Sequence, residues 1–224
     1  MKMKNKLYII IGSIIIVLAI VAAGIFLIAT KDVKPSTSSF DFDGTWRLFD
    51  STATTADEQY LVFEDGRVNL YKEKDKAYIT SDFKYTGGLL ELPEADVEFV
   101  VNIGTDNCLF LYGPNAVAYT MVRYTGEPFV EQNYNMSLLL GNWDIVLRGK
   151  EARENETLVL EGNTMKNDRN GQLVEATFTF EGNTLVINEL GSKMVVCSLE
   201  EDYAILVEIA PTIGQAYELA RSQD

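Results

Sequence analysis

One group of acidic side chains is spaced in a way that would suit the binding of a cation or a basic partner. Glu91, Glu94, Asp96 and Glu98 lie within eight residues of one another. Strand alternation would place Glu94, Asp96 and Glu98 on one face, where they could bind a cation or a basic partner. A solvated run that protects a sheet edge explains the same residues more simply. The cluster gives a candidate interaction surface.

Two other acidic features could suggest catalysis or metal binding. Glu64 and Glu161 occupy matching places in two similar halves of the chain. A glycosidase needs two carboxyls about 5–10 Å apart in one cleft, whereas these two lie beside turns in separate halves. Residues 41–44, Asp-Phe-Asp-Gly, look like the opening of a calcium loop, but no acidic residues follow at the spacing that six or more oxygen ligands need. We expect a turn there and no metal site.

The composition excludes several function classes. The 224 residues include no histidine, which removes the commonest general base near pH 7 and most zinc, copper and iron sites. The chain has 19 basic and 33 acidic residues, and three lysines are the only charges before residue 30, so the remainder carries a net charge of −17. Such a surface repels phosphate backbones. We expect no cofactor, no nucleic acid and no enzymatic activity.

The N-terminal region has the pattern of a membrane anchor. Leu7 to Ala29 form 23 positions without a charge, against roughly 20 that a membrane-spanning helix needs. The three lysines in residues 1–6 predict a cytoplasmic N-terminus and export of everything after residue 30, across what would be a bacterial cytoplasmic membrane. The alternative is a signal peptide cleaved near Ala22 and Ala23. Residues 30–40 read as a polar tether.

The exported part contains an internal repeat. The matching segments are Gly44-Thr45-Trp46 with Gly141-Asn142-Trp143, Phe83-x-Tyr85-x-Gly87 with Phe178-x-Phe180-x-Gly182, Phe99-Val100-Val101 with Met194-Val195-Val196, and Ala118-Tyr119-x-x-x-Arg123 with Ala216-Tyr217-x-x-x-Arg221. They are collinear with small gaps. We therefore predict one unit over residues 41–124, a linker over 125–137 and a second unit over 138–222.

Each copy has the periodicity of strands. Aromatic and polar residues alternate, and turn signals such as Asp65-Gly66 and Gly162-Asn163 separate the runs. In the first copy the pattern predicts strands at about 44–50, 58–64, 67–72, 77–85, 89–93, 97–103, 108–112 and 117–124. The predicted fold is all-β, with two tandem eight-stranded antiparallel meanders behind one N-terminal transmembrane helix. The stretch from Gln215 to Ser222 has a helical composition, but its alignment favours a strand.

The ends of each copy predict how its edges are covered. Pairing the first strand with the last would close each meander. Gly44 and Trp46 open the first copy and Arg123 closes it. We predict a cation–π contact between Arg123 and Trp46, worth roughly 0.5–2 kcal/mol. The same contact is expected in the second copy, and both are structural contacts that do no chemistry. The second set is Gly141, Trp143 and Arg221.

The Gly-x-Trp opening and the arginine of the last strand resemble the signature of lipocalin-like, calycin-type barrels. The short version with an Asp-Gly turn is similar to bacterial lipocalin-like domains of unassigned function. The resemblance covers residues 41–124 and 138–222, and it implies a small barrel in each copy. True lipocalins have a ligand cavity but are much longer per barrel. An interior filled by side chains is therefore the first expectation, and a ligand pocket is the alternative.

Two strand-like runs do not alternate. Residues 109–112 and 204–207 are apolar at both parities, which gives each strand two hydrophobic faces. One face fills its own barrel. The other packs against the sister copy or offers a docking patch that includes Phe110 and Tyr112. Cys108 and Cys197 lie in similar apolar runs, so we expect two buried thiols and no disulfide framework.

These observations favour a membrane-anchored, extracytoplasmic binding or scaffold protein. The expected partner is another protein, and the charge of −17 favours a cationic one, as in an inhibitor or immunity role. The alternative is carriage of a lipid or other small apolar ligand inside one barrel. A cavity above about 300 Å³ lined by inward-facing residues would favour that alternative.

Overall fold

The computed structural model describes residues 40–130 and 132–223. Across these two ranges the regular elements are strands and three short 3-10 helices. No helix in this part of the chain is long and apolar enough to cross a membrane. The predicted membrane segment, residues 7–29, and its flank, residues 1–6, lie outside the described residues.

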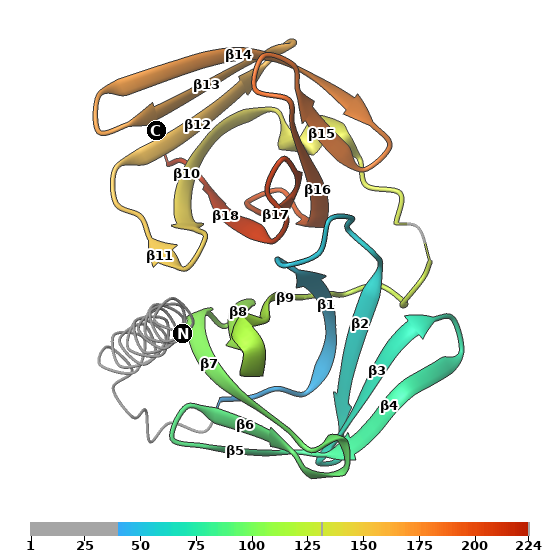
Figure 1. The fold of residues 1–224 in the computed structure, drawn as a ribbon. Helices are drawn as coiled ribbons and strands as arrows, with labels where there is room; N and C mark the ends of the chain where they lie inside the picture. Colours follow the sequence, from blue (N-terminus) through green and yellow to red (C-terminus); the bar gives the residue numbers. More distant parts are fainter. Residues whose placement is uncertain (1–39, 131, 224) are drawn as a thin grey trace, which may run out of the picture. The chain divides into compact units, whose positions relative to one another are not determined.

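The first sheet is antiparallel, in the order β4-β3-β2-β1-β9-β8-β7-β6-β5 (Figure 1). Its strands are β1 (Gly44–Asp50), β2 (Gln59–Glu64), β3 (Arg67–Glu73), β4 (Lys76–Asp82), β5 (Lys84–Thr86), β6 (Leu89–Leu92), β7 (Val97–Thr105), β8 (Cys108–Tyr112) and β9 (Ala118–Arg123). The two ends of that order, β4 and β5, are separated along the chain by Phe83 alone. The sheet therefore curves back on itself into a barrel-like form.

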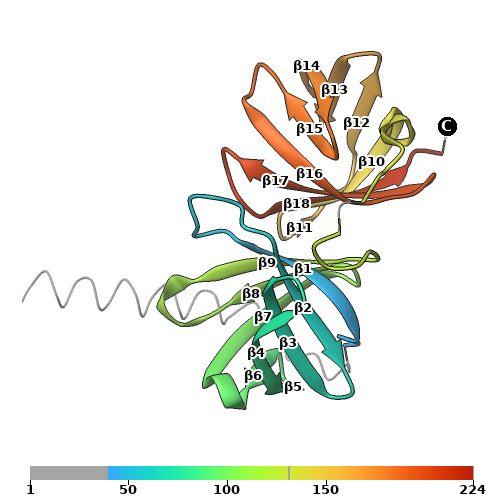
Figure 2. The ribbon, with the colours of Figure 1, turned by 90° about the vertical axis from the view of Figure 1, so that its right-hand side faces the viewer.

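The second sheet repeats this arrangement. Its strands are β10 (Gly141–Arg148), β11 (Glu151–Ala152), β12 (Glu156–Glu161), β13 (Thr164–Arg169), β14 (Gln172–Glu181), β15 (Thr184–Ile187), β16 (Ser192–Leu199), β17 (Tyr203–Ala210) and β18 (Gln215–Arg221). The long strand β14 pairs with β13 through its first half and with β15 through its second half. Because β10 pairs with both β12 and β18, the first and last long strands lie side by side (Figures 1 and 2).

The two barrel-like all-β sheets confirm the predicted fold class of the described residues. The strand expected at 77–85 is divided at Phe83 into β4 and β5. The stretch from Gln215 to Ser222 contains strand β18 rather than a helix. The 3-10 helices are η1 (Pro93–Ala95), η2 (Pro114–Ala116) and η3 (Met136–Leu139).

Each sheet encloses a core, and a third cluster joins the two. The third cluster contains Phe49, Cys108, Phe110 and Val122 from the first sheet and Leu147, Val195, Cys197, Ile205, Val207 and Ala216 from the second, with Ile213 of the β17–β18 turn. Its members from β8 and β17 are the outward side chains of the two strands that do not alternate. The expectation that these faces pack against the sister copy is therefore confirmed.

The two cysteines are free and buried in that third cluster. Desolvation by burial raises the pKa of the Cys197 thiol to about 11, and it raises the pKa of Cys108 as well. Neither thiol is ionised at neutral pH, so both behave as small apolar side chains.

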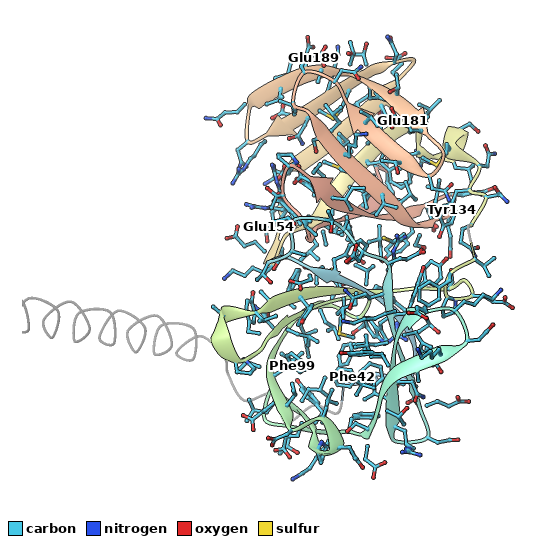
Figure 3. The ribbon with its side chains drawn as sticks, turned by 45° about the vertical axis from the view of Figure 1, so that its right-hand side comes forward. Phe42, Phe99, Tyr134, Glu154, Glu181 and Glu189 are labelled. Atoms are coloured by element: carbon cyan, nitrogen blue, oxygen red, sulfur yellow. The ribbon has the colours of Figure 1, made fainter. Side chains whose placement is uncertain are left out.

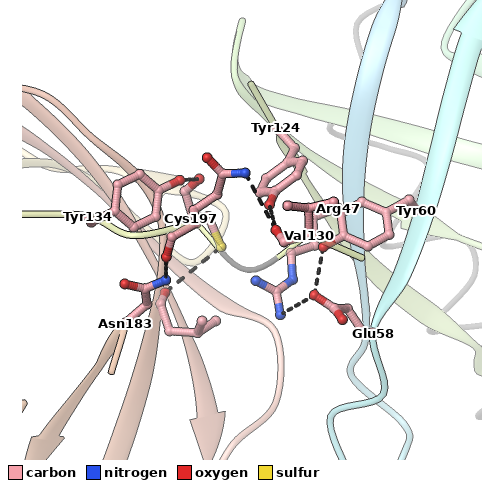
Figure 4. A network of polar contacts seen from close by, with 10 residues as sticks. Arg47, Glu58, Tyr60, Tyr124, Val130, Tyr134, Asn183 and Cys197 are labelled. Carbon is pink, nitrogen blue, oxygen red and sulfur yellow. Dashed lines mark hydrogen bonds and ion pairs between the residues drawn. The ribbon is translucent and has the colours of Figure 1, made fainter. Parts of the chain in front are cut away.

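Polar contacts hold the linker against both sheets (Figure 4). The Tyr134 hydroxyl donates to the carbonyl of Cys197 at 2.7 Å, and the Tyr124 hydroxyl donates to the carbonyl of Val130 at 3.2 Å. The two sheets are also joined directly, because the Asn107 side-chain amide donates to the Tyr203 hydroxyl at 3.0 Å.

Candidate functional site

The structure places the predicted tryptophan and arginine pairs in contact at one end of each barrel. Trp46 is the register partner of Arg123, and Trp143 is the register partner of Arg221. The guanidinium carbons lie 4.4 Å and 3.7 Å from the respective ring centroids. Both tryptophans are fully buried. The predicted cation–π contacts are therefore present, and each lies where the first strand meets the last.

Each arginine also fastens the segment that precedes its first strand. Arg221 donates from Nη1 to the carbonyl of Leu140 at 2.9 Å and from Nη2 to that of Leu138 at 2.7 Å. Arg123 donates in the same way to the carbonyls of Asp43 and Asp41, at 2.7 and 3.1 Å. The planar guanidinium matches this pair of acceptors, which the single charge of a lysine does not.

The recurring glycines leave room for these guanidiniums. Gly141 has φ +119°, and a Cβ there would lie 2.7 Å from Arg221 Nη1. Gly44 has φ +113°, and its Cβ would lie 3.3 Å from Arg123 Nη1. The Gly-x-Trp pattern thus records a steric requirement in both copies.

The opposite end of the second barrel holds a cavity of about 510 Å³. Its inner wall is apolar and lies on strand positions near Trp143. The inner residues include Ile145, Leu158, Leu185, Leu206 and Leu219. The mouth lies where the β13–β14, β15–β16 and β17–β18 turns meet, and Leu190 and Val174 stand there with 53% and 42% of their surface exposed. A cavity of this volume falls in the range that small-molecule sites occupy.

A β-bulge turns one charged side chain into this cavity. In β10 the register with β18 shifts between Ile145 and Leu147. Leu147 consequently points into the cluster between the sheets, while Arg148 lines the cavity. Bulges commonly re-aim a side chain in this way.

A buried carboxyl lies beside Arg148 at the mouth of the cavity. Glu208 of β17 is only 7% exposed, and its Oε1 accepts a hydrogen bond from Ser192 Oγ at 2.8 Å. Burial raises the pKa of Glu208, while the Ser192 hydroxyl and the charge of Arg148 act in the opposite direction. Gln215 is its register partner in β18 and also lines the cavity.

The Arg148 guanidinium is neutralised by a different carboxyl. Its Nη1 lies 2.7 Å from Oε1 of Glu156, which is 2% exposed, and its Cζ lies 5.5 Å from the ring centroid of Tyr217. Arg153 approaches the same carboxyl at 3.6 Å and pairs with Glu151 at 2.8 Å. These two arginines and two glutamates balance in charge.

Aromatic rings occupy the interior of the first barrel. Figure 3 labels two of them, Phe42 and Phe99. The Phe42 ring contacts those of Phe63, Phe83 and Tyr85 at centroid distances of 5.3, 5.9 and 5.0 Å. The Phe99 ring lies 6.0 Å from that of Tyr119. These rings fill space that the second barrel leaves open.

Register shows which residues replace the rings in the second barrel. Gly44 faces Phe63, whereas Gly141 faces Leu160. The Trp46 indole donates to the carbonyl of Phe42, and the Trp143 indole donates to that of Leu139. Three phenylalanines of the first barrel thereby correspond to smaller or more flexible side chains. The correspondences are Phe42 with Leu139, Phe63 with Leu160 and Phe99 with Met194.

In the first barrel, a glycine occupies the position that corresponds to Glu208. Val100 pairs with Tyr112 as Val195 pairs with Val207, so Gly113 corresponds to Glu208. A Cβ on Gly113 would lie 3.0 Å from the Phe99 ring. The first copy therefore has a ring over a glycine where the second has a methionine beside a carboxyl.

The predicted acidic face does not form. Glu94 lies in η1 and Asp96 has φ 52°, because Pro93 starts a 3-10 turn and interrupts the strand. Glu98 alone of the three lies in β7. Glu94 Oε2 accepts hydrogen bonds from Ser81 Oγ and the amide of Asp82, at 2.5 and 2.9 Å, so it closes a turn.

The predicted apolar docking patch of Phe110 and Tyr112 also does not form as one surface. Phe110 is 6% exposed and packs in the cluster between the sheets, whereas Tyr112 is 38% exposed. In the candidate calcium loop, the amide of Asp43 donates to Asp41 Oδ1 at 3.0 Å, as the expected turn requires. The described residues contain no group of three or more acidic, cysteine or histidine side chains arranged to hold a metal ion.

Sequence reasoning did not identify Arg148, Glu208, Ser192 or Gln215. The sequence did contain one signal for Glu208. This residue shares the alternation parity of Ala204 and Leu206 in an otherwise apolar strand, so its side chain is expected to face the barrel interior. A charged residue at an inward position marks a polar site inside a barrel.

Neither the family models nor the curated proteins include a match to this chain. Among solved structures, a protein of unknown function from the DUF3598 family of Nostoc punctiforme is similar at 12% identity. The alignment covers 81% of this chain and 96% of that one, with a TM-score of 0.33.

Proposed function

We propose that this protein is a non-enzymatic, membrane-anchored extracytoplasmic protein whose second, lipocalin-like barrel binds a small apolar or amphiphilic molecule. The observation that carries the proposal is the cavity of about 510 Å³ in the second barrel. It exceeds the roughly 300 Å³ at which small-molecule sites begin. The apolar inner wall and the exposed leucine and valine at the mouth suit a hydrocarbon chain that enters from one end.

The difference in interior packing between the two copies supports the same proposal. The first barrel is packed with rings, and its outer face helps to bury the outer face of the second. The first copy therefore acts as a support, and the second copy acts as the binding module.

The proposal can be tested by analysing what the protein carries from its native membrane. The full chain is purified beside a double variant, Met194→Trp with Leu206→Trp, which fills the cavity. An exposed substitution, Tyr78→Trp, is the matched control. We expect one apolar molecule per wild-type or control chain and none with the double variant, measured by solvent extraction and mass spectrometry. Equal amounts in all three samples, or none in any, would contradict the proposal.

Engagement of a protein partner is a second hypothesis. It is supported by the charge of −17 beyond residue 30 and by the exposed ring of Tyr112. A photo-crosslinking residue at position 112, activated in native membranes, tests it. A single adduct with one basic protein would support the hypothesis, and adducts with lipid alone would oppose it.

A further inference from the structure

We infer that the second barrel selects an amphiphile with a primary ammonium head group, bound by the Glu208 carboxylate while its apolar chain fills the inner cavity. This inference rests on the proposed function and specifies its ligand. The arrangement of the cavity suits such a ligand. Polar residues lie at the mouth, and the wall near Trp143 is apolar. A ligand with one polar end fits this cavity with its head group outward.

The charged residues that the structure describes around the cavity leave Glu208 without an ion-pair partner. Arg148 and Arg153 are balanced by Glu156 and Glu151 through contacts of 2.7, 3.6 and 2.8 Å. Glu208 has no ion-pair partner within 4.0 Å among the described residues. A buried carboxylate without a counter-ion is costly, and a cation supplied by a ligand removes that cost.

Hydrogen-bond acceptors are grouped around Glu208. Glu208 Oε1 accepts from Ser192 Oγ, and its Oε2 accepts no hydrogen bond from the described residues. Ser192 and Gln215 line the same part of the cavity. An ammonium group has three donors, and this corner offers three acceptors in the Glu208 carboxylate, the Ser192 hydroxyl oxygen and the Gln215 amide oxygen.

The first barrel provides an internal comparison. Gly113 stands where the second copy has Glu208, and the Phe99 ring closes over it. The carboxyl and the open space therefore occur together in the second copy, and neither occurs at the corresponding place in the first.

The test compares three probes of equal chain length, decylamine, decanol and decanoate. Calorimetric titrations use the full chain in phospholipid nanodiscs, and empty nanodiscs correct for partitioning. We expect decylamine to bind at least about tenfold more tightly than decanol, because hydrogen bonds to charged groups contribute about 1.5–3 kcal/mol. In Glu208→Gln this preference should fall to about one. In Glu175→Gln, an exposed control on β14, it should persist.

The outcomes separate this inference from the proposed function. Decanol binding that is equal in wild type and Glu208→Gln shows that the variant cavity is intact. If decanol binds but decylamine has no advantage, or keeps its advantage in Glu208→Gln, the ammonium inference is wrong and the proposed function stands. Tightest binding of decanoate would also overturn the inference. If none of the probes binds, both are wrong.

Discussion

Arg221 lies with its guanidinium carbon 3.7 Å from the ring centroid of Trp143, and the two residues are register partners in β18 and β10. Arg123 and Trp46 repeat the relationship in the first sheet. Each pair joins the last strand to the first, and each arginine also binds the carbonyls of the preceding segment. The contacts thus hold the last strand of each sheet against the first strand and against the residues just before it, which are distant from the arginine in sequence.

Replacing Arg221 by alanine should lower the free energy of unfolding by about 2–4 kcal/mol. The variant loses the cation–π contact and leaves the carbonyls of Leu138 and Leu140 without their donor. Chemical denaturation followed by tryptophan fluorescence measures the change. Arg169→Ala, an exposed arginine, is the control. Equal stability of the two variants would show that the guanidinium does not hold the barrel closed.

Gly141→Ala should destabilise the protein more than Gly162→Ala. Both positions have positive φ, but a Cβ at Gly141 meets Arg221 Nη1 at 2.7 Å, whereas nothing lies within 4 Å at Gly162. We expect a loss of about 1–2 kcal/mol at Gly162 from the backbone conformation alone and about 2–4 kcal/mol at Gly141. Thermal denaturation of both variants checks the difference, and a smaller loss at Gly141 would refute the steric explanation.

Most of the fold could be predicted from the sequence, because alternation and turn residues report local structure and the repeat supplied a second copy of each signal. The predictions that were wrong or incomplete have local causes. Alternation from Glu94 to Glu98 ignored Pro93, whose fixed φ favours a 3-10 turn. In β10, the alternation of Trp143, Ile145 and Leu147 places Arg148 outside, and only the bulge brings it inward.

The cavity could not be predicted because it depends on small differences in volume. Phe63 and Leu160 are both apolar inward residues, and a hydrophobic pattern does not distinguish them. The difference becomes visible only when register shows that several rings of one barrel face smaller side chains in the other.

The contribution of Glu208 to the stability of the protein without ligand should fall as pH rises above the ordinary glutamate pKa of about 4.3. Burial raises the pKa of Glu208 in the folded state, so the folded state binds the proton more tightly than the unfolded state. The stabilisation is complete below the unfolded pKa and is lost as pH rises through the folded pKa. The charged and titratable groups facing Glu208 are Arg148 and Tyr217.

Melting temperatures of wild type and Glu208→Gln, measured across this pH range, isolate that contribution. The difference between the two melting temperatures should change steadily with pH, because the wild type becomes less stable relative to Glu208→Gln as pH rises. A difference that does not vary with pH would show that Glu208 titrates normally.

Neither cysteine should react with a thiol reagent in the native protein. Both are buried, and burial raises the pKa of each thiol, to about 11 for Cys197. Labelling with dithionitrobenzoate at about pH 8 should proceed only as fast as the protein opens, and denaturant should expose both thiols. Rapid labelling of one thiol in the native state would indicate that the cluster between the sheets is not closed.

A crystal structure of the protein with decanol that carries a terminal bromine would show directly where an apolar ligand binds. We predict anomalous density for one bromine inside the second barrel, among Ile145, Leu185 and Leu206, and none inside the first. A bromine inside the first barrel, or only on the outer surface, would show that the second barrel is not the binding module.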